Sequence, residues 1–144
     1  MTQIAIDALL LAVKNRLNIP GQPWGARVYP YQAPAKTPYP YVVIIPSGGG
    51  ERNQQKARDA EIVMVVKVVS DKLGEAFAAA SAVDGLLNDH GAQETSDALS
   101  TGSSEWSILT ATGEEAISYL EMFANVTPVY HAGARYRFVM EASR

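Results

Sequence analysis

The chain has 144 residues, a length that predicts one domain with a sizeable hydrophobic core. It has no cysteine, which excludes disulfides, thiol chemistry and thiolate metal sites. Its net charge of −3 argues against a protein that coats nucleic acid, because such proteins normally carry a basic surface. We expect a soluble protein that does not enter a membrane, because the sequence shows neither a secretory signal nor an apolar run of about 18 residues.

The first predicted element is an amphipathic helix over residues 3–17, with Thr2 as its N-cap. Lys14 and Arg16 fall in its last turn, where positive charge favours the helix dipole. The helix ends at residues 18–25, which contain two prolines and two glycines. Its apolar stripe, at helical spacing, comprises Ile6, Leu9, Leu10, Val13 and Leu17.

A proline-rich stretch separates a short strand, predicted at residues 27–31, from a buried strand predicted at 41–45. Tyr29, Tyr31 and Tyr39 belong to this region. One interpretation is that their rings pack on the rim of the core while their hydroxyl groups stay in water. The other is that they form a protein contact, because tyrosine is enriched at interfaces. Both interpretations remain open from the sequence.

Residues 47–57 are polar and glycine-rich, and they lie between two predicted strands. The three glycines do not form a phosphate-binding loop, because no Lys-Ser or Lys-Thr pair follows them. We predict a long hairpin that projects from the sheet, either as a solvated tip or as a contact surface. The residues predicted to make this contact are Glu51, Arg52, Asn53, Gln54, Gln55 and Lys56.

A strand over residues 58–69 runs directly into a helix over residues 71–91. Both faces of the strand are apolar at its middle, which predicts cover on both sides: a helix on one, and a second layer or neighbouring subunit on the other. Ser70 and Asp71 offer N-cap oxygens, and Gly91 ends the helix. The side chains expected to face the sheet are Leu73, Phe77, Ala80, Val83 and Leu87.

The last third of the chain predicts a loop and three strands. The loop, residues 92–104, is a second candidate contact surface. The strands cover residues 105–112, 119–127 and 134–142; a break at residues 113–115 and a turn at residues 128–133 separate them. Glu121 is expected to face Arg135 or Arg137 across the final hairpin. Together these elements predict one α/β (α+β) domain over residues 1–144, with a mixed, mostly antiparallel sheet and two helices packed on it.

The sequence shows no cluster that indicates catalysis, a cofactor or a metal. His90 and His131 have no partner at ligand spacing; the first is expected at a helix end and the second in an exposed turn. No serine nucleophile elbow, dinucleotide fingerprint or calcium loop occurs. The least poor acid–base site would combine Glu114 and Glu115 with Tyr119.

The order of elements, together with particular segments, resembles the tail terminator (tail-completion) proteins of long-tailed bacteriophages and prophages. The segments are IDALLLAVKNRL, RVYP, TPYPYVVI, EAFAAASAVDGLLND and the closing ARYRFVMEA. The resemblance runs over nearly the whole chain, and residues 91–118 fit it least well. It implies a structural, non-enzymatic virion protein, assembled in the host cytoplasm, that acts without a cofactor.

The resemblance also implies partners. Family members form a ring, here expected to be a hexamer, that caps the tail tube, stops its polymerisation and meets the head–neck connector. DNA then crosses the channel only as passive cargo. Alternatives are another neck, head-completion or tail-tube protein, a small host module that adds a strand to its sheet edge, and an enzyme with an unmarked acid–base site.

Overall fold

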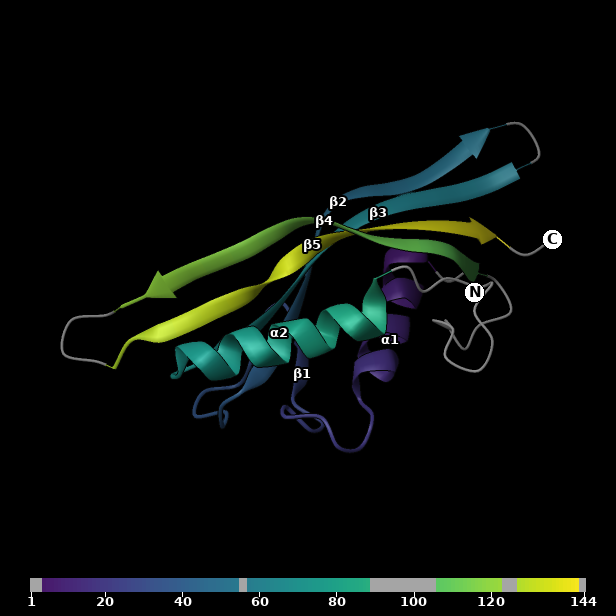
Figure 1. The fold of residues 1–144 in the computed structure, drawn as a ribbon. Helices are drawn as coiled ribbons and strands as arrows, with labels where there is room; N and C mark the ends of the chain where they lie inside the picture. Colours follow the sequence, from purple (N-terminus) through teal and green to yellow (C-terminus); the bar gives the residue numbers. More distant parts are fainter. Residues whose placement is uncertain (1–3, 55–56, 89–105, 123–126, 143–144) are drawn as a thin grey trace.

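The computed structural model describes residues 4–54, 57–88, 106–122 and 127–142; of residues 50–54, 57 and 58 it describes the backbone only. Two helices and five strands follow one another along this part of the chain (Figure 1). The fold is therefore α+β, as predicted. Its elements are α1 (Ala5–Leu17), β1 (Val28–Pro30), β2 (Tyr41–Gln54), β3 (Ala57–Ser70), α2 (Leu73–Leu87), β4 (Trp106–Glu121) and β5 (Val129–Ala142).

The five strands form one mixed sheet in the order β1-β2-β3-β5-β4. Only the β1–β2 pair is parallel, and the other three pairs are antiparallel. β3 is central, as predicted from its two apolar faces. The β2–β3 and β4–β5 hairpins turn at opposite ends of the sheet (Figure 1). The sheet is thus long in the strand direction, with one hairpin at each end.

Both helices pack on the same face of the sheet (Figure 1). The core between them holds the apolar stripe of α1 and one alternating face of every strand. Trp24 closes one side of this core, and its indole N–H donates a 2.8 Å hydrogen bond to the carbonyl of Leu17. The inward side chains of β5 are Tyr136, Phe138 and Met140, as the alternation predicts. Neither helix, nor any other helix in the described residues, is long and apolar enough to cross a membrane.

The opposite face of the sheet carries no helix, and we call it the open face. On β3 this face includes Val63 and Val65, which are half-buried, and Val69, which is buried. Within the described residues only part of the predicted second cover is present. It is the proline-rich segment between β1 and β2, which lies over one end of the face. The remaining valines stay available to another molecule.

Two predicted interruptions are wrong, because the strands run through them. β4 continues through Gly113 by means of two bulges, between Ile108 and Thr110 and between Gly113 and Glu115. β5 likewise occupies residues 129–133, which were predicted as a turn. There, small residues mark a close strand approach: a Cβ on Gly133 would lie 2.1 Å from the carbonyl oxygen of Val66. The final three predicted strands are therefore two long ones.

The buried face of α2 also differs from the prediction. Ala76, Ala79, Val83 and Leu87 are buried, whereas Leu73 and Phe77 are 48% and 46% exposed. Small side chains face the sheet because they let the helix lie close to it. The helix begins after Lys72, and Ser70 acts from outside it: its hydroxyl accepts from the Lys72 N–H and donates to Glu75. The other predicted helix ends, Thr2 and Gly91, lie outside the described residues.

Candidate protein-interaction surfaces

The predicted hairpin is present in the backbone as the outer part of β2 and β3. Residue pairs run from Gly48↔Val63 out to Gln54↔Ala57. Glu51, Arg52, Asn53 and Gln54 thus belong to β2, whereas Gln55 and Lys56 lie outside the described residues. β1 covers only residues 42–44 of β2. Among the described strands none pairs with the outer edge of β2 beyond this point, so its backbone groups are available to a partner.

Two of the three predicted tyrosines contact a fourth, Tyr41. Tyr39 stacks on Tyr41 with ring centroids 5.7 Å apart, and Tyr29 meets the same ring edge-on at 6.4 Å. Tyr31 is 59% exposed and lines the same pocket as Tyr39 and Tyr41. The rim interpretation therefore describes Tyr29, which is half-buried, while Tyr31 and Tyr39 present large exposed rings.

The hairpin and the tyrosine cluster do not form one surface. Tyr41 is the first residue of β2 and Gln54 the last, in a strand of 14 residues. At about 3.3 Å per residue, the two regions are roughly 40 Å apart. The sequence-predicted contact residues therefore divide into two separate candidate surfaces at opposite ends of the sheet.

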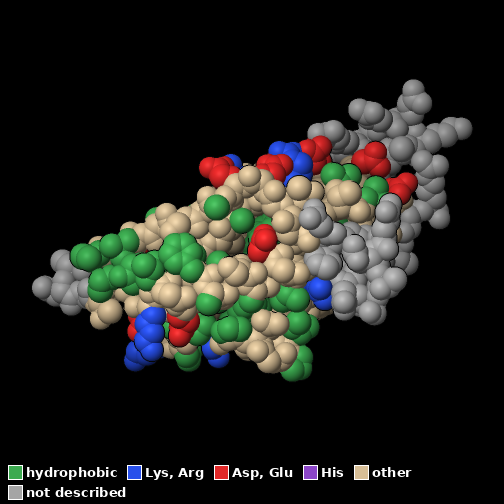
Figure 2. Space-filling model, viewed as in Figure 1, with side chains coloured by type: hydrophobic (Ala, Val, Ile, Leu, Met, Phe, Trp, Pro, Cys, Tyr) green, Lys and Arg blue, Asp and Glu red, His purple; other side chains and the backbone are tan. Residues whose placement is uncertain are grey.

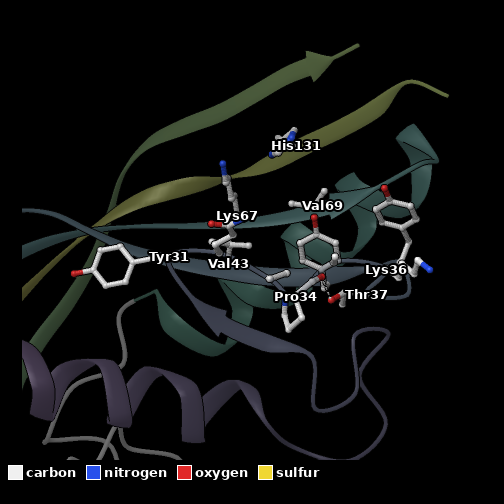
Figure 3. Close-up of a pocket in the computed structure, with 13 residues that line it drawn as sticks. Tyr31, Pro34, Lys36, Thr37, Val43, Lys67, Val69 and His131 are labelled. Atoms are coloured by element: carbon white, nitrogen blue, oxygen red, sulfur yellow. Dashed lines mark hydrogen bonds between the residues drawn. The ribbon is translucent and has the colours of Figure 1, made fainter. Parts of the chain in front are cut away.

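The tyrosine end of the open face contains a pocket of about 440 Å³ (Figure 3). Val43, Lys67, Val69 and His131 contribute its strand side, and residues 31–37 its loop side. Lys67 is held by β4: its ammonium donates a 2.6 Å hydrogen bond to the hydroxyl of Tyr119 and lies 5.2 Å from that ring's centroid.

His131 is the one described histidine, and its position contradicts the prediction of an exposed turn. It lies in β5, is 7% exposed, and stacks on Tyr119 with centroids 4.3 Å apart. Its Nε2 is 3.0 Å from a carboxylate oxygen of Glu121. Burial and the charge of Lys67 lower the pKa of His131, and Glu121 opposes them. The imidazole is therefore held toward its neutral form.

Farther along the open face, arginines and carboxylates pair across the strands. Arg135 pairs with Glu115 at 3.3 Å, and Arg137 bridges Glu61 and Glu114. The hydrogen bond from Arg137 lowers the pKa of Glu114. The predicted contact between Glu121 and one of these arginines is wrong, because Glu121 lies instead against His131.

These pairings also deprive the enzyme hypothesis of its best candidate residues. Glu114 and Glu115 are exposed and engaged by arginines, and the hydroxyl of Tyr119 accepts from Lys67. Glu114 and Glu115 border a groove beside α2, but Tyr119 is not part of its lining, so the three groups do not converge there. Within the described residues, no group of three or more His, Asp or Glu side chains is placed to hold a metal.

An exposed apolar surface lies where α2 begins beside the β4–β5 hairpin, and we call it the apolar end. Hydrophobic side chains gather there on the molecular surface (Figure 2). A groove of about 450 Å³ between α2 and β4 adjoins it, lined by Phe77 and Ala116 among others. Sequence reasoning missed this surface because it assigned the bulky side chains of α2 to the core. The residues of the apolar end are Leu73, Phe77, Leu120 and Met122, whose exposed fractions range from 46% to 62%.

A chain with two hairpins, an uncovered sheet face and an exposed apolar end is organised for contacts with other proteins. The chain belongs to the family described as "Tail completion protein gp17", whose sequence model matches residues 5–108. The resemblance expected from the sequence is thereby confirmed, and the protein is a structural, non-enzymatic component of the virion tail.

A solved structure agrees with this assignment at the level of the fold. A chain of the structure titled "Virion of native gene transfer agent (GTA) particle" superposes with a TM-score of 0.70 at 20% sequence identity. The alignment covers 97% of this chain and 99% of that chain. No curated protein sequence matches the chain. The α+β fold thus recurs, over nearly its full length, in a chain of a gene transfer agent particle.

Proposed function

We propose that this tail completion protein is a ring-forming terminator. Six copies would close into a collar that caps the tail tube, stops its polymerisation and joins the tail to the head–neck connector. DNA would cross the collar as passive cargo. The observation that carries the proposal is the β2–β3 hairpin, which extends away from the helices (Figure 1) and leaves its outer edge without a described partner.

The distribution of surfaces supports a ring. A closed ring uses heterologous contacts, in which one patch meets a different patch of the next copy. This chain offers distinct surfaces for that purpose: the open face with half-buried Val63 and Val65, and the apolar end on the helix side. The hairpin then remains for the axial contact with the tail tube.

The hairpin can be shortened without disturbing the rest of the sheet. Arg52 pairs with Asp59, and the pairing of β3 with β5 begins at Asp59, so replacing residues 53–58 by Asn-Gly leaves a two-residue hairpin in the same register. We expect this variant to keep its circular dichroism spectrum and its assembly state, yet to lose the capping of purified tail tubes, which would then grow longer in electron micrographs.

Two results would count against the proposal. Normal tube lengths with the shortened hairpin would remove the hairpin from capping. Unlimited polymerisation of the wild-type protein alone, without rings, would instead indicate a tail-tube subunit. A variant with Lys14→Gln, on the exposed side of α1, serves as the matched control and is expected to cap tubes normally.

A further inference from the structure

The pocket at the tyrosine end of the open face has a charge opposite to that of the whole chain. The protein carries a net charge of −3, but the charged residues that line the pocket are Lys36 and Lys67. Among the described lining residues there is no carboxylate. Glu121 lies against His131 and is outside the lining. The pocket is therefore a local basic site on an acidic protein.

Lys67 keeps hydrogen-bonding capacity for a ligand. An ammonium has three N–H donors, and the described contact with Tyr119 uses one of them. The same contact restricts the side chain, since Lys67 is also half-buried between its neighbouring strands. Figure 3 shows Lys67 and His131 rising from adjacent strands on the same side of the sheet. A positioned ammonium loses less entropy on binding an anion than a free one.

The loop side of the pocket carries two unusual backbone conformations. Tyr31 and Lys36 have φ angles of 63° and 66°, in the left-handed region that bulky residues seldom adopt. The N–H of Tyr31 donates a 2.9 Å hydrogen bond to the carbonyl of Ile44, which holds that residue in place. Both residues line the pocket. Strained positions of this kind gather at ligand sites.

We propose that this pocket binds an acidic peptide segment of a partner protein, with a carboxylate side chain at the ammonium of Lys67 and flanking residues near Lys36 and against Tyr31 and Tyr39. A volume of about 440 Å³ suits a few side chains. Exposed tyrosine rings supply rigid apolar contact at low entropic cost. The site is independent of ring closure, so it goes beyond the proposed capping function.

The neighbouring charges favour a peptide over nucleic acid. Aromatic rings with lysines also bind single strands, whose phosphates repeat at every nucleotide. Farther along the described open face, Arg135 and Arg137 are already paired with Glu115, Glu61 and Glu114, so these arginines are less available to the phosphates of an extended strand. A single carboxylate needs only the pocket, whereas a continuing phosphate chain has to cross these paired charges.

The test is titration of the ¹⁵N-labelled protein with acetyl-tetraglutamate, followed by amide chemical shifts. Acetyl-tetraglutamine is the neutral control peptide, and a thymidine tetranucleotide represents nucleic acid. We expect the acidic peptide to shift the amides of the non-proline residues between 31 and 41 and of residues 67 and 131, with a dissociation constant of about 1 mM because so few groups are contacted.

Variants decide whether the two lysines are responsible. Lys36→Gln lies on an exposed loop and leaves the sheet intact, and we expect it to weaken binding about threefold. Lys67→Gln is expected to weaken it about tenfold, and Lys14→Gln on α1 leaves it unchanged. Equal binding of acetyl-tetraglutamine, tighter binding of the oligonucleotide at the same amides, no binding at all, or no loss in either pocket variant would each overturn the proposal.

Discussion

At the scale of single residues, the main surprise is His131. In the sequence it stands among tyrosine, alanine and glycine, which reads as a turn; in the structure it is 7% exposed beneath the ring of Tyr119. Its partners are Tyr119 and Glu121, across the hairpin in β4, and Lys67 in β3, which is remote in sequence. Local sequence patterns carry no signal for such cross-strand partners. The inward tyrosine of β5, by contrast, follows from alternation and is found where predicted.

The buried imidazole predicts a loss of stability in mild acid. The pKa of His131 is lowered from 6.5 in the folded protein, mainly by burial and then by Lys67. As the pH falls through 6.5, the unfolded chain takes up this proton first, so the free energy of unfolding decreases. His131→Phe keeps the ring stack without titrating. Urea unfolding at pH 8 and pH 5.5 should show a smaller acid loss for the variant.

A second variant tests whether Lys67 contributes to the lowered pKa of His131. Lys67→Met removes the charge that lowers the pKa of His131, so its acid loss should lie between those of the wild type and His131→Phe. Parallel stability–pH curves for all three proteins would show that the imidazole does not titrate differently on folding.

The hydroxyl of Tyr136 provides a second residue-scale prediction. This side chain is 1% exposed, and its hydroxyl donates a 2.8 Å hydrogen bond to Asp84 of α2. Burial and this carboxylate raise the pKa of Tyr136. Tyr136→Phe should lower the free energy of unfolding by about 1–2 kcal/mol, because the acceptor is charged. Asp84→Asn keeps an acceptor oxygen, so urea unfolding should show a smaller loss; the reverse ranking would contradict this.

At the scale of elements, periodicity predicted which elements exist better than it predicted their ends and faces. β3 and α1 follow their apolar patterns closely. β4 and β5 extend through glycines, because pairing between neighbouring strands outweighs the local preference of glycine for turns. On α2 two apolar stripes compete, and contact with the sheet selects the small one. That choice depends on the distance between helix and sheet, which a sequence pattern does not contain.

Two glycine-to-alanine substitutions should have opposite effects on the stability of the folded protein. A Cβ at Gly133 would meet backbone atoms of β3, including the Lys67 Cα at 2.6 Å, so Gly133→Ala should destabilise the protein by about 3 kcal/mol. A Cβ at Gly85 in α2 meets nothing within 4 Å, so Gly85→Ala should stabilise it by about 0.5–1 kcal/mol. Thermal unfolding measures both. Similar melting temperatures for the two variants would refute the close strand approach.

At the scale of the whole molecule, the sequence identified the family and the fold class, and the family match confirms a structural tail protein. The hairpin was also predictable, because its glycine-rich polar segment lies between two strong strand patterns. The pocket and the apolar end were not, since each combines residues from several elements. Ile117, for example, joins Phe77 in the groove beside the apolar end only after β4 and α2 have packed together.

The apolar end predicts an effect on assembly without an effect on folding. Phe77 and Leu120 are 46% and 49% exposed, so Phe77→Ser with Leu120→Ser should change the free energy of unfolding by less than about 1 kcal/mol. If neighbouring copies cover this surface, analytical ultracentrifugation with tail tubes present should show fewer rings. Leu11→Ser, at another 46% exposed leucine on α1, is the control. Unchanged ring formation in the double variant would show that the apolar end is not part of the contact between subunits.

The placement of the two hairpins at opposite ends of one long sheet has a directional consequence. One extremity ends in the polar segment that includes Arg52 and Asn53, and the other in the hydrophobic residues Leu73 and Met122. A subunit with such unlike extremities fits a stack of proteins in one sense only. In the reverse orientation, hydrophobic side chains would face a partner surface that is complementary to polar and charged groups. Each subunit is therefore polar along its long direction, and a collar built from such subunits has two chemically different faces.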